Sequence, residues 1–471
     1  MTTEKKAVDR RSFMKGALAT AAVIPFSSVL AACAGNDSGS DNNTKGGGKV
    51  SAKNPFGMAD KSSVDSVIFD GGYGTDYVSF AATLMEKNHA GSSVKVSPTT
   101  KIAQELQPRF VGGNPPDLID NSGENAIGFS TILDQIEDLK DVLDANNLEG
   151  TPIRDTLFGG VEEPGTYNGK LAALNYVLTV YAVWYSASLF DQNGWAPPKT
   201  WDEAMALGAK AKAQNKYLFL WGKEAATYYQ TLAIGSAIKQ GGDEVRLALE
   251  NLEAKCWSHP AMQDVLKAMG AIVKAGYVKP GGAGTQFTAA QAQWSNDQDA
   301  LLYPSGSWIE NEMKDQTATD FKMTGFPEMT VSGDSSMPYE ALHSASGEPY
   351  VVPSKAKNVA GGKELLRTML SKEAATNFAK TKLAPTIVKG TVPADGFGST
   401  ALVSQNDMLS NAGTNVFTWK FVDLYGTNAD QLVIWNSFLA GKADVAELTS
   451  KLQEISDKIR EDDSIKKIKV T

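Results

Sequence analysis

Cysteine and histidine most often carry metal, redox or nucleophilic chemistry, and this chain of 471 residues has few of either. Its two cysteines, Cys33 and Cys256, cannot build a disulfide framework and do not form a Cys-x-x-Cys pair. Its three histidines, His89, His259 and His343, are far apart, and none belongs to a His-Glu-x-x-His pattern. These spacings argue against a zinc site. We therefore expect no metal and no cofactor, and we interpret Cys256 as a small buried hydrophobic residue.

The charge balance argues against a nucleic-acid partner. The chain has 45 Lys+Arg and 54 Asp+Glu, which gives a formal net charge of −9. A nucleic-acid-binding surface needs clustered Lys and Arg to neutralise phosphates, so we expect no nucleic-acid partner. The content of 42% hydrophobic and 21% charged residues is typical of a globular protein, and the length favours two lobes or domains.

The N-terminus carries signals of export and lipidation. Arg10 and Arg11 begin a pattern typical of a twin-arginine export signal. The apolar run at 17–30 is too short to span a bilayer and is typical of the hydrophobic region of a signal peptide. It leads into Leu-Ala-Ala-Cys at 30–33, which resembles a lipobox and predicts cleavage before Cys33 and a lipid on its thiol. The alternative is an ordinary Ala-rich cleavage site with an incidental cysteine.

The segment after Cys33 is almost wholly Gly, Ser, Asn, Asp, Thr and Lys, and it cannot bury enough apolar surface to offset its ordering entropy. We predict a twin-arginine lipoprotein signal peptide at 1–32, and a lipidated Cys33 with a flexible tether at 33–53. The signal carries five Lys+Arg and two Asp+Glu, so its removal takes the net charge from −9 to about −12. We expect a body anchored by lipid to the extracytoplasmic face of the cell membrane.

Strand and helix patterns alternate along the body, which predicts parallel sheets with right-handed crossovers. Strands are predicted at 64–69, 94–96, 117–120, 181–185, 218–221 and 300–303.

Caps and the spacing of apolar residues predict three helices. A helix after Thr100 carries Ile102 and Phe110 on one face, and Pro108 predicts that it ends early. Thr200 and Glu203 form a capping box. Apolar residues spaced 3-4-3-4 from Val445 to Ile459 predict a one-faced helix that starts at Asp444.

Two polar loops are expected to lie at one edge of the first sheet. They are Gly71–Gly74, after the first strand, and Asn121–Asn125, after the third. In parallel sheets, ligands bind outside the carboxyl ends of the strands. The Gly-rich loop lacks the full phosphate-binding pattern, so a plain turn and a ligand loop both remain open.

Several stretches, in one order along the body, resemble the extracellular solute-binding proteins of carbohydrate ABC importers. They are TYNGKLAALNY at 166–176, Trp184-Tyr185, Leu189-Phe190 with Gly194, PKTWDE at 198–203, Gly306-Ser307-Trp308 and Tyr350–Pro353. A second set of stretches more specifically resembles the N-acetylglucosamine/diacetylchitobiose-binding lipoproteins. It consists of FDGGYG at 69–74, LQPRF at 106–110, GNPPD at 113–117, DNSG at 120–123 and GSWIENEM at 306–313.

The resemblance implies an α/β, two-lobed, periplasmic-binding-protein-like fold. Each lobe would be a doubly wound sheet, with hinge crossovers and a ligand cleft between the lobes. Lobe one would comprise 62–176 plus 343–390, and lobe two 177–342 plus 391–471. The ligand would be bound by hinge closure.

The resemblance also implies sugar-binding residues, because aromatic rings stack on the apolar faces of sugars and polar side chains bond their hydroxyls. The candidates are Trp308, Trp221, Tyr73, Asn121, Glu124, Asn175, Tyr176, Tyr228, Glu310 and Glu348. For each aromatic candidate the alternative is a core position, and for Asn121 and Glu124 it is a turn or a helix cap.

The implied function is capture of N-acetylglucosamine and/or a chitobiose-type oligosaccharide without catalysis, by a monomer that delivers it to an ABC permease. No Walker motif is present, so a separate cytoplasmic ATPase would power the importer. The alternatives are a different mono- or oligosaccharide, a secreted two-carboxylate glycosidase or a surface scaffold. No nucleophile elbow, metal motif or acid/base signature supports the enzyme.

Overall fold

The computed structural model describes residues 47–331 and 333–470, apart from the side chains of residues 345 and 346. The predicted signal peptide with Arg10 and Arg11, the lipidation site Cys33 and the tether up to residue 46 lie outside the described residues. The strands are β1 Ser63–Phe69, β2 Ser93–Thr99, β3 Leu118–Asp120, β4 Thr166–Tyr167, β5 Lys170–Leu171, β6 Leu174–Ser186, β7 Tyr217–Phe219, β8 Ala300–Gly306, β9 Met323–Phe326, β10 Leu342–Val351 and β11 Val416–Phe417.

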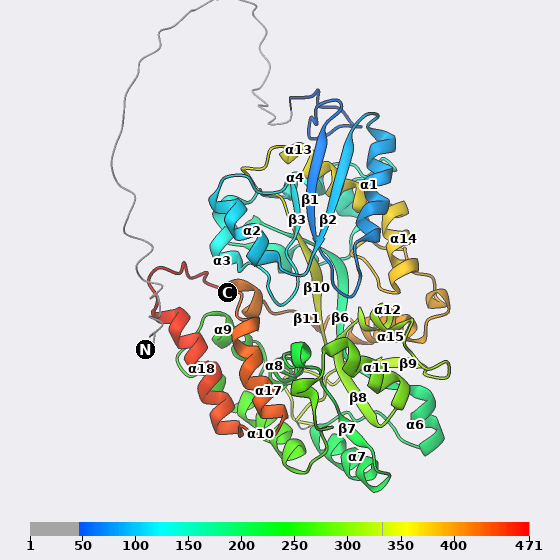
Figure 1. The fold of residues 1–471 in the computed structure, drawn as a ribbon, viewed down its shortest axis with the longest axis vertical. Helices are drawn as coiled ribbons and strands as arrows, with labels where there is room; N and C mark the ends of the chain where they lie inside the picture. Colours follow the sequence, from blue (N-terminus) through cyan, green and yellow to red (C-terminus); the bar gives the residue numbers. More distant parts are fainter. Residues whose placement is uncertain (1–46, 332, 471) are drawn as a thin grey trace, which may run out of the picture. The chain divides into compact units, whose positions relative to one another are not determined.

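Helices separate most of these strands along the chain (Figure 1). They are α1 Asp76–Asn88, α2 Ile102–Val111, α3 Phe129–Ile132, α4 Lys140–Asp144, α5 Ile153–Thr156, α6 Ala187–Asn193, α7 Trp201–Ala213, α8 Tyr228–Gly241, α9 Asp243–Glu250, α10 Pro260–Lys274, α11 Phe287–Asp297, α12 Ile309–Met313, α13 Val359–Met369, α14 Lys372–Lys382, α15 Thr400–Ala412, α16 Phe421–Tyr425, α17 Asn428–Leu439 and α18 Val445–Glu461.

One mixed sheet of nine strands runs through residues 47–470. Its main order is β2-β1-β3-β10-β6-β8-β7, while β9 pairs with β6 and β11 with β10. The pairs β1–β2, β1–β3 and β7–β8 are parallel, as the alternation of strands and helices predicts. The central pairs β3–β10, β10–β6 and β6–β8 are antiparallel. The long strands β6 and β10 therefore join a β1–β3 half to a β7–β9 half (Figure 1).

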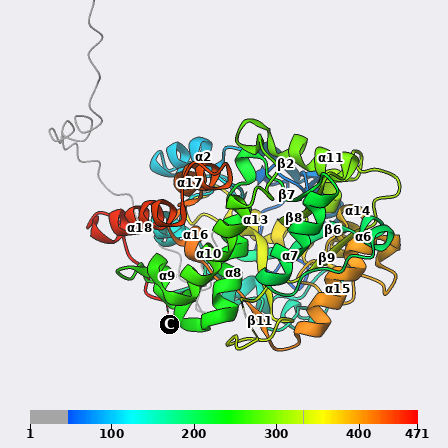
Figure 2. The same ribbon diagram turned by 90° about the horizontal axis from the view of Figure 1, so that it is seen from below.

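Helices cover both faces of each half, so four apolar clusters form rather than one. In the β1–β3 half, α1, α13 and α14 pack on one face and α2 and α3 on the other. In the β7–β9 half, α7, α8 and α10 pack on one face and α11 and α15 on the other, as the view from below shows (Figure 2).

The C-terminal segment contacts both halves. Trp435 and Leu448 pack in the core of the β7–β9 half, whereas Leu424 and Ile468 pack with Phe129 in the core of the β1–β3 half. The segment thus forms a further connection between the two halves, beside β6 and β10.

The predicted strands are all present, but β6 begins seven residues before the predicted start at Tyr181. Its first residues are almost continuously buried, and they pair with β10 rather than with a neighbour in sequence. A strand formed by such distant pairing has no local signal of its length.

The prediction for α2 is wrong at both ends. Lys101, not Thr100, precedes the helix, and no side chain caps it. The helix also continues past Pro108 to Val111. Pro108 lies in the last turn and removes one backbone hydrogen bond there, while the buried face of Ile102 and Phe110 holds the helix in place.

Three other local predictions are confirmed. Thr200 accepts a hydrogen bond from the Glu203 N–H at 3.2 Å, and Asp444 accepts one from the Glu447 N–H at 2.9 Å. Cys256 is buried. Among the described residues, no helix is both long and apolar enough to cross a membrane.

Close packing of α13 on β3 generates the first prediction. A Cβ added at Gly362 would lie 2.0 Å from the Asp117 carbonyl oxygen, so Gly362→Ala should force the helix away from the sheet. We expect a loss of about 1–3 kcal/mol in unfolding free energy, measured by chemical denaturation. The control is Gly159→Ala, because a Cβ there meets nothing within 4 Å. Equal stability of both variants would contradict this packing.

Candidate functional site

The loop after β1 contacts the segment after β8, which belongs to the other half of the sheet. The Asn311 Nδ2 donates a hydrogen bond to the Gly72 carbonyl at 2.6 Å, and the Tyr73 hydroxyl lies 3.3 Å from the Ser307 Oγ. A Cβ at Gly72 would lie 2.9 Å from the Trp308 Cδ1, so only glycine allows this approach. These contacts join the two halves at the carboxyl end of β1.

Aromatic rings gather around Trp308, which is half-buried. The Tyr181 and Tyr228 rings lie 5.6 and 5.7 Å from the Trp308 ring, both in edge-on geometry. His343 then stacks between Tyr181, at 4.5 Å, and Trp419, at 5.1 Å. Burial lowers the pKa of His343 to about 3, so this stack is uncharged at neutral pH. Such rings can receive the apolar face of a flat, neutral ligand.

A pair of buried carboxyl groups lies where β3 meets β10. Asp120 ends β3, and its side chain shares a hydrogen bond with Glu348 of β10 and accepts one from the Ser122 hydroxyl. Burial raises the pKa of both Asp120 and Glu348, and in Asp120 the nearby Glu348 raises it further. Glu348 has a φ of +55°, a left-handed conformation that is costly for a residue with a side chain.

Two more carboxyl groups lie on α12, directly after Trp308. Burial raises the pKa of Glu310 and of Glu312 to about 7. The Ser399 hydroxyl donates to Glu310, and the Gln291 Nε2 donates to Glu312 at 2.9 Å. Glu310 therefore faces the start of α15.

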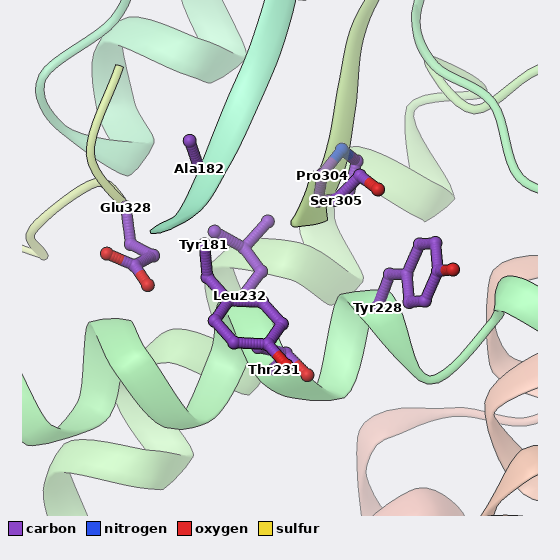
Figure 3. Close-up of a pocket in the computed structure, with 8 residues that line it drawn as sticks. All are labelled: Tyr181, Ala182, Tyr228, Thr231, Leu232, Pro304, Ser305 and Glu328. Atoms are coloured by element: carbon purple, nitrogen blue, oxygen red, sulfur yellow. The ribbon is translucent and has the colours of Figure 1, made fainter. Parts of the chain in front are cut away.

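Two hollows near this region have polar and aromatic linings. The first hollow is lined by Tyr181, Ala182, Tyr228, Thr231, Leu232, Pro304, Ser305 and Glu328, between β6, β8 and the first turns of α8 (Figure 3). The second hollow lies between the loop after β3 and α16–α17, and its polar lining includes Asn121, Glu124, Asp423 and Asn428.

The structure places four predicted candidates around the contact between the halves. Tyr73 is buried in the loop after β1, Trp308 follows β8, Tyr228 begins α8 and Glu348 lies on β10. Glu124 is half-buried at the second hollow, and burial and the nearby Glu224 raise its pKa.

Other candidates are engaged in internal packing. The Trp221 Nε1 donates to the Asn436 Oδ1 at 3.1 Å, and the Tyr176 hydroxyl donates to the Met369 carbonyl at 3.1 Å. Asn121 bonds both the N–H and the carbonyl of Ile127 at 2.8 Å, which closes the loop after β3.

Asn175 remains a candidate within the sheet. It is buried on β6 and pairs in register with Pro349 of β10.

The candidate list from the sequence omits Tyr181, Glu328, His343 and Asp120. Asp120 has a local signal, because a carboxylate at the end of a buried strand is unusual. Tyr181 and His343 meet only through the pairing of β6 with β10, and Glu328 lies between β9 and β10 without any motif. No group of three His, Cys, Asp or Glu residues in the described part of the chain could hold a metal ion.

Comparison with known proteins shows the family. The model of the bacterial extracellular solute-binding protein family matches residues 71–376. The chain is 61% identical over 471 residues to the diacetylchitobiose binding protein NgcE of Streptomyces coelicolor, and the match covers 100% of both chains. It is also 30% identical over 238 residues to a probable sugar-binding periplasmic protein of Mesorhizobium japonicum, covering 48% of this chain and 51% of that protein.

Solved structures show the fold. A chitin oligosaccharide binding protein superposes with a TM-score of 0.69 and 17% identity, over 85% of this chain and 99% of that one. The solute-binding protein RafE in complex with raffinose superposes with a TM-score of 0.66 and 19% identity, over 84% of this chain and 99% of that one. Both are two-lobed solute-binding proteins, so the predicted α/β two-lobed fold is confirmed.

The raised pKa of Glu310 generates a pH prediction. Its carboxyl titrates near pH 7 when folded but near its ordinary 4.5 when unfolded. Its contribution to folding therefore becomes more unfavourable as the pH rises from about 4.5 to about 7. Glu310→Gln removes this titration, so the melting temperature of the variant minus that of the wild type should increase between pH 5 and pH 8.

The matched control is Glu454→Gln, which removes an exposed carboxylate from α18. A Glu310→Gln difference that stays constant with pH, or that is larger at pH 5, would contradict the burial of this carboxyl group.

Proposed function

Because this chain belongs to the bacterial extracellular solute-binding protein family, we propose that it captures N-acetylglucosamine and/or a chitobiose-type oligosaccharide for an ABC importer. The observation that carries the proposal is the 61% identity, along both entire chains, to a diacetylchitobiose binding protein. The family consists of solute-binding proteins rather than enzymes, so the secreted glycosidase is set aside. Its members act outside the cytoplasm.

The sugar would bind between the loop after β1 and the segment after β8. We assign Trp308 the role of stacking platform, because its half-buried ring lies between the two halves and beside Tyr181 and Tyr228. Glu348 and Tyr73 would meet sugar hydroxyls at the floor of this cleft, where Asp120 and Ser307 already form hydrogen bonds with them.

Capture would proceed by a hinge motion at β6 and β10. These are the strands shared by both halves, so a small bend in them would separate Trp308 from Gly72. The lobes would be those predicted, 62–176 plus 343–390 and 177–342 plus 391–471. In this division, the C-terminal part of lobe two also packs against the core of the β1–β3 half through Leu424 and Ile468.

Delivery would require partners. We propose that lipidated Cys33 holds the monomeric protein at the outer face of the membrane after export through the twin-arginine signal. A permease would receive the sugar, and a separate cytoplasmic ATPase would supply the energy. A different mono- or oligosaccharide remains the alternative ligand.

The role of Trp308 can be tested directly. Trp308→Ala should weaken diacetylchitobiose binding by about 2–4 kcal/mol in calorimetry, because it removes a buried aromatic anchor. Trp195→Ala removes another half-buried tryptophan, which packs on Phe190 at 5.9 Å, and should leave affinity unchanged. Unchanged affinity in Trp308→Ala would remove this residue from the site.

The choice of sugar can be tested with a thermal-shift panel of mono- and disaccharides, with and without N-acetyl groups. At equal concentration, a ligand that binds the folded state more tightly raises the melting temperature further. N-acetylglucosamine or diacetylchitobiose should give the largest shifts. A panel in which only neutral hexoses or maltose-type sugars stabilise the protein would favour the alternative ligand.

A further inference from the structure

The first hollow contains a buried carboxylate with no hydrogen-bond partner within 3.5 Å in the described part of the chain. Glu328 is 2% exposed, and neither of its carboxylate oxygens has a hydrogen-bond partner among the described residues. The nearest nitrogen atoms of basic side chains are the Lys239 Nζ at 3.9 Å and the Nδ1 of the uncharged His343 at 3.7 Å, both too distant for a hydrogen bond. Buried polar groups are nearly always bonded, so this carboxylate indicates an absent donor.

The remaining walls of the first hollow are complementary in chemistry. The Ser305 hydroxyl is also buried and without a partner among the described residues, so it is available to donate. Leu232 and Pro304 supply apolar surface (Figure 3). The hollow is open on one side, and most of the empty space among its lining atoms is solvent at the mouth, so a ligand group would occupy the mouth rather than a preformed enclosed cavity. It therefore offers an acceptor, a donor and an apolar wall to one small group.

The first hollow also lies next to the proposed stacking platform. Tyr181 and Tyr228 line it, and the same two rings contact Trp308 edge-on. Figure 3 shows Glu328 and Tyr228 on opposite sides of the hollow, with the Tyr181 ring between them. A substituent of a sugar ring stacked near Trp308 would thus enter between these side chains.

We propose that the first hollow is the specificity pocket for an N-acetyl group of the bound sugar, with Glu328 accepting a hydrogen bond from the amide N–H. This inference rests on the proposed function. An acetamido group has one N–H donor, one carbonyl acceptor and one methyl group, which match Glu328, Ser305 and the Leu232–Pro304 wall respectively. A hydroxyl at the same ring position has no methyl group to fill the apolar part.

The surroundings of Glu328 favour a neutral donor over a cation. Lys239 is fully buried, and its Nζ donates to the Glu328 backbone carbonyl at 2.6 Å, so one positive charge already lies beside the carboxylate. A protonated amine would add a second cation next to it. An N-acetylated sugar is therefore preferred to its deacetylated counterpart.

The test compares two ligands in calorimetry: diacetylchitobiose, and cellobiose, in which hydroxyls replace the acetamido groups of the same β-1,4-linked rings. Glu328→Gln keeps the shape of the side chain but reduces its strength as an acceptor. We expect it to weaken diacetylchitobiose binding by about tenfold or more and to leave cellobiose unaffected, so that the ratio of the two Kd values contracts. If cellobiose binds too weakly for its Kd to be measured, the weakest measurable affinity gives a lower bound on the cellobiose Kd divided by the diacetylchitobiose Kd.

A second variant and a control keep the test decisive. Thr231→Leu fills the first hollow from α8 without altering Glu328, and it should contract the same ratio even if Glu328→Gln does not fold. Glu244→Gln, at an exposed position on α9, should leave the ratio unchanged.

The outcomes separate the two proposals. If the wild type binds diacetylchitobiose but the variants keep its ratio of Kd values, or lose both ligands equally, the specificity pocket is overturned and the proposed function stands. If the wild type binds no N-acetylated sugar, both are overturned.

Discussion

The pairing of β6 with β10 is the constraint on which the rest of the structure depends. Leu174–Val180 of β6 lies in antiparallel register with residues 344–350 of β10, and the same β6 then continues to pair with β8. Two strands therefore belong to both halves of one sheet, each half with apolar clusters on its two faces. Because the halves share these strands, the loop after β1 and the segment after β8 meet at Gly72 and Trp308, although more than two hundred residues separate them.

Carboxyl groups whose pKa is raised by burial are the second feature of this region. Burial raises the pKa of Asp120, Glu348, Glu310, Glu312 and Glu328. A protein core gains no stability from such groups, since each carries a desolvation cost. Sites that recognise hydroxyl or amide donors do need them, because an unmet buried acceptor rejects ligands that lack the donor. Under the proposed function, these acids would serve ligand recognition rather than folding stability.

Local signals in the sequence predicted most elements and proposed several residues of the candidate site. Thr200, Glu203 and Asp444 cap helices as expected, because capping depends on residues three positions apart. Trp308 and Tyr73 were candidates from the sequence because each follows a strand end, and both lie at the contact between the halves. The sequence could not reveal that Tyr181 stacks on His343 or that Glu348 meets Asp120, since these contacts arise from the register of β10 against its neighbours. Tyr176 and Trp221 show the converse: aromatic residues near a strand end are equally suited to the core.

The central claim is that one sugar is held between the two halves of the sheet, against Trp308. A crystal structure of the protein with diacetylchitobiose bound tests this most directly. The account predicts a sugar ring in van der Waals contact with the Trp308 side chain, with hydrogen bonds to residues of both halves. A sugar bound to one half alone, or away from Trp308, would contradict it.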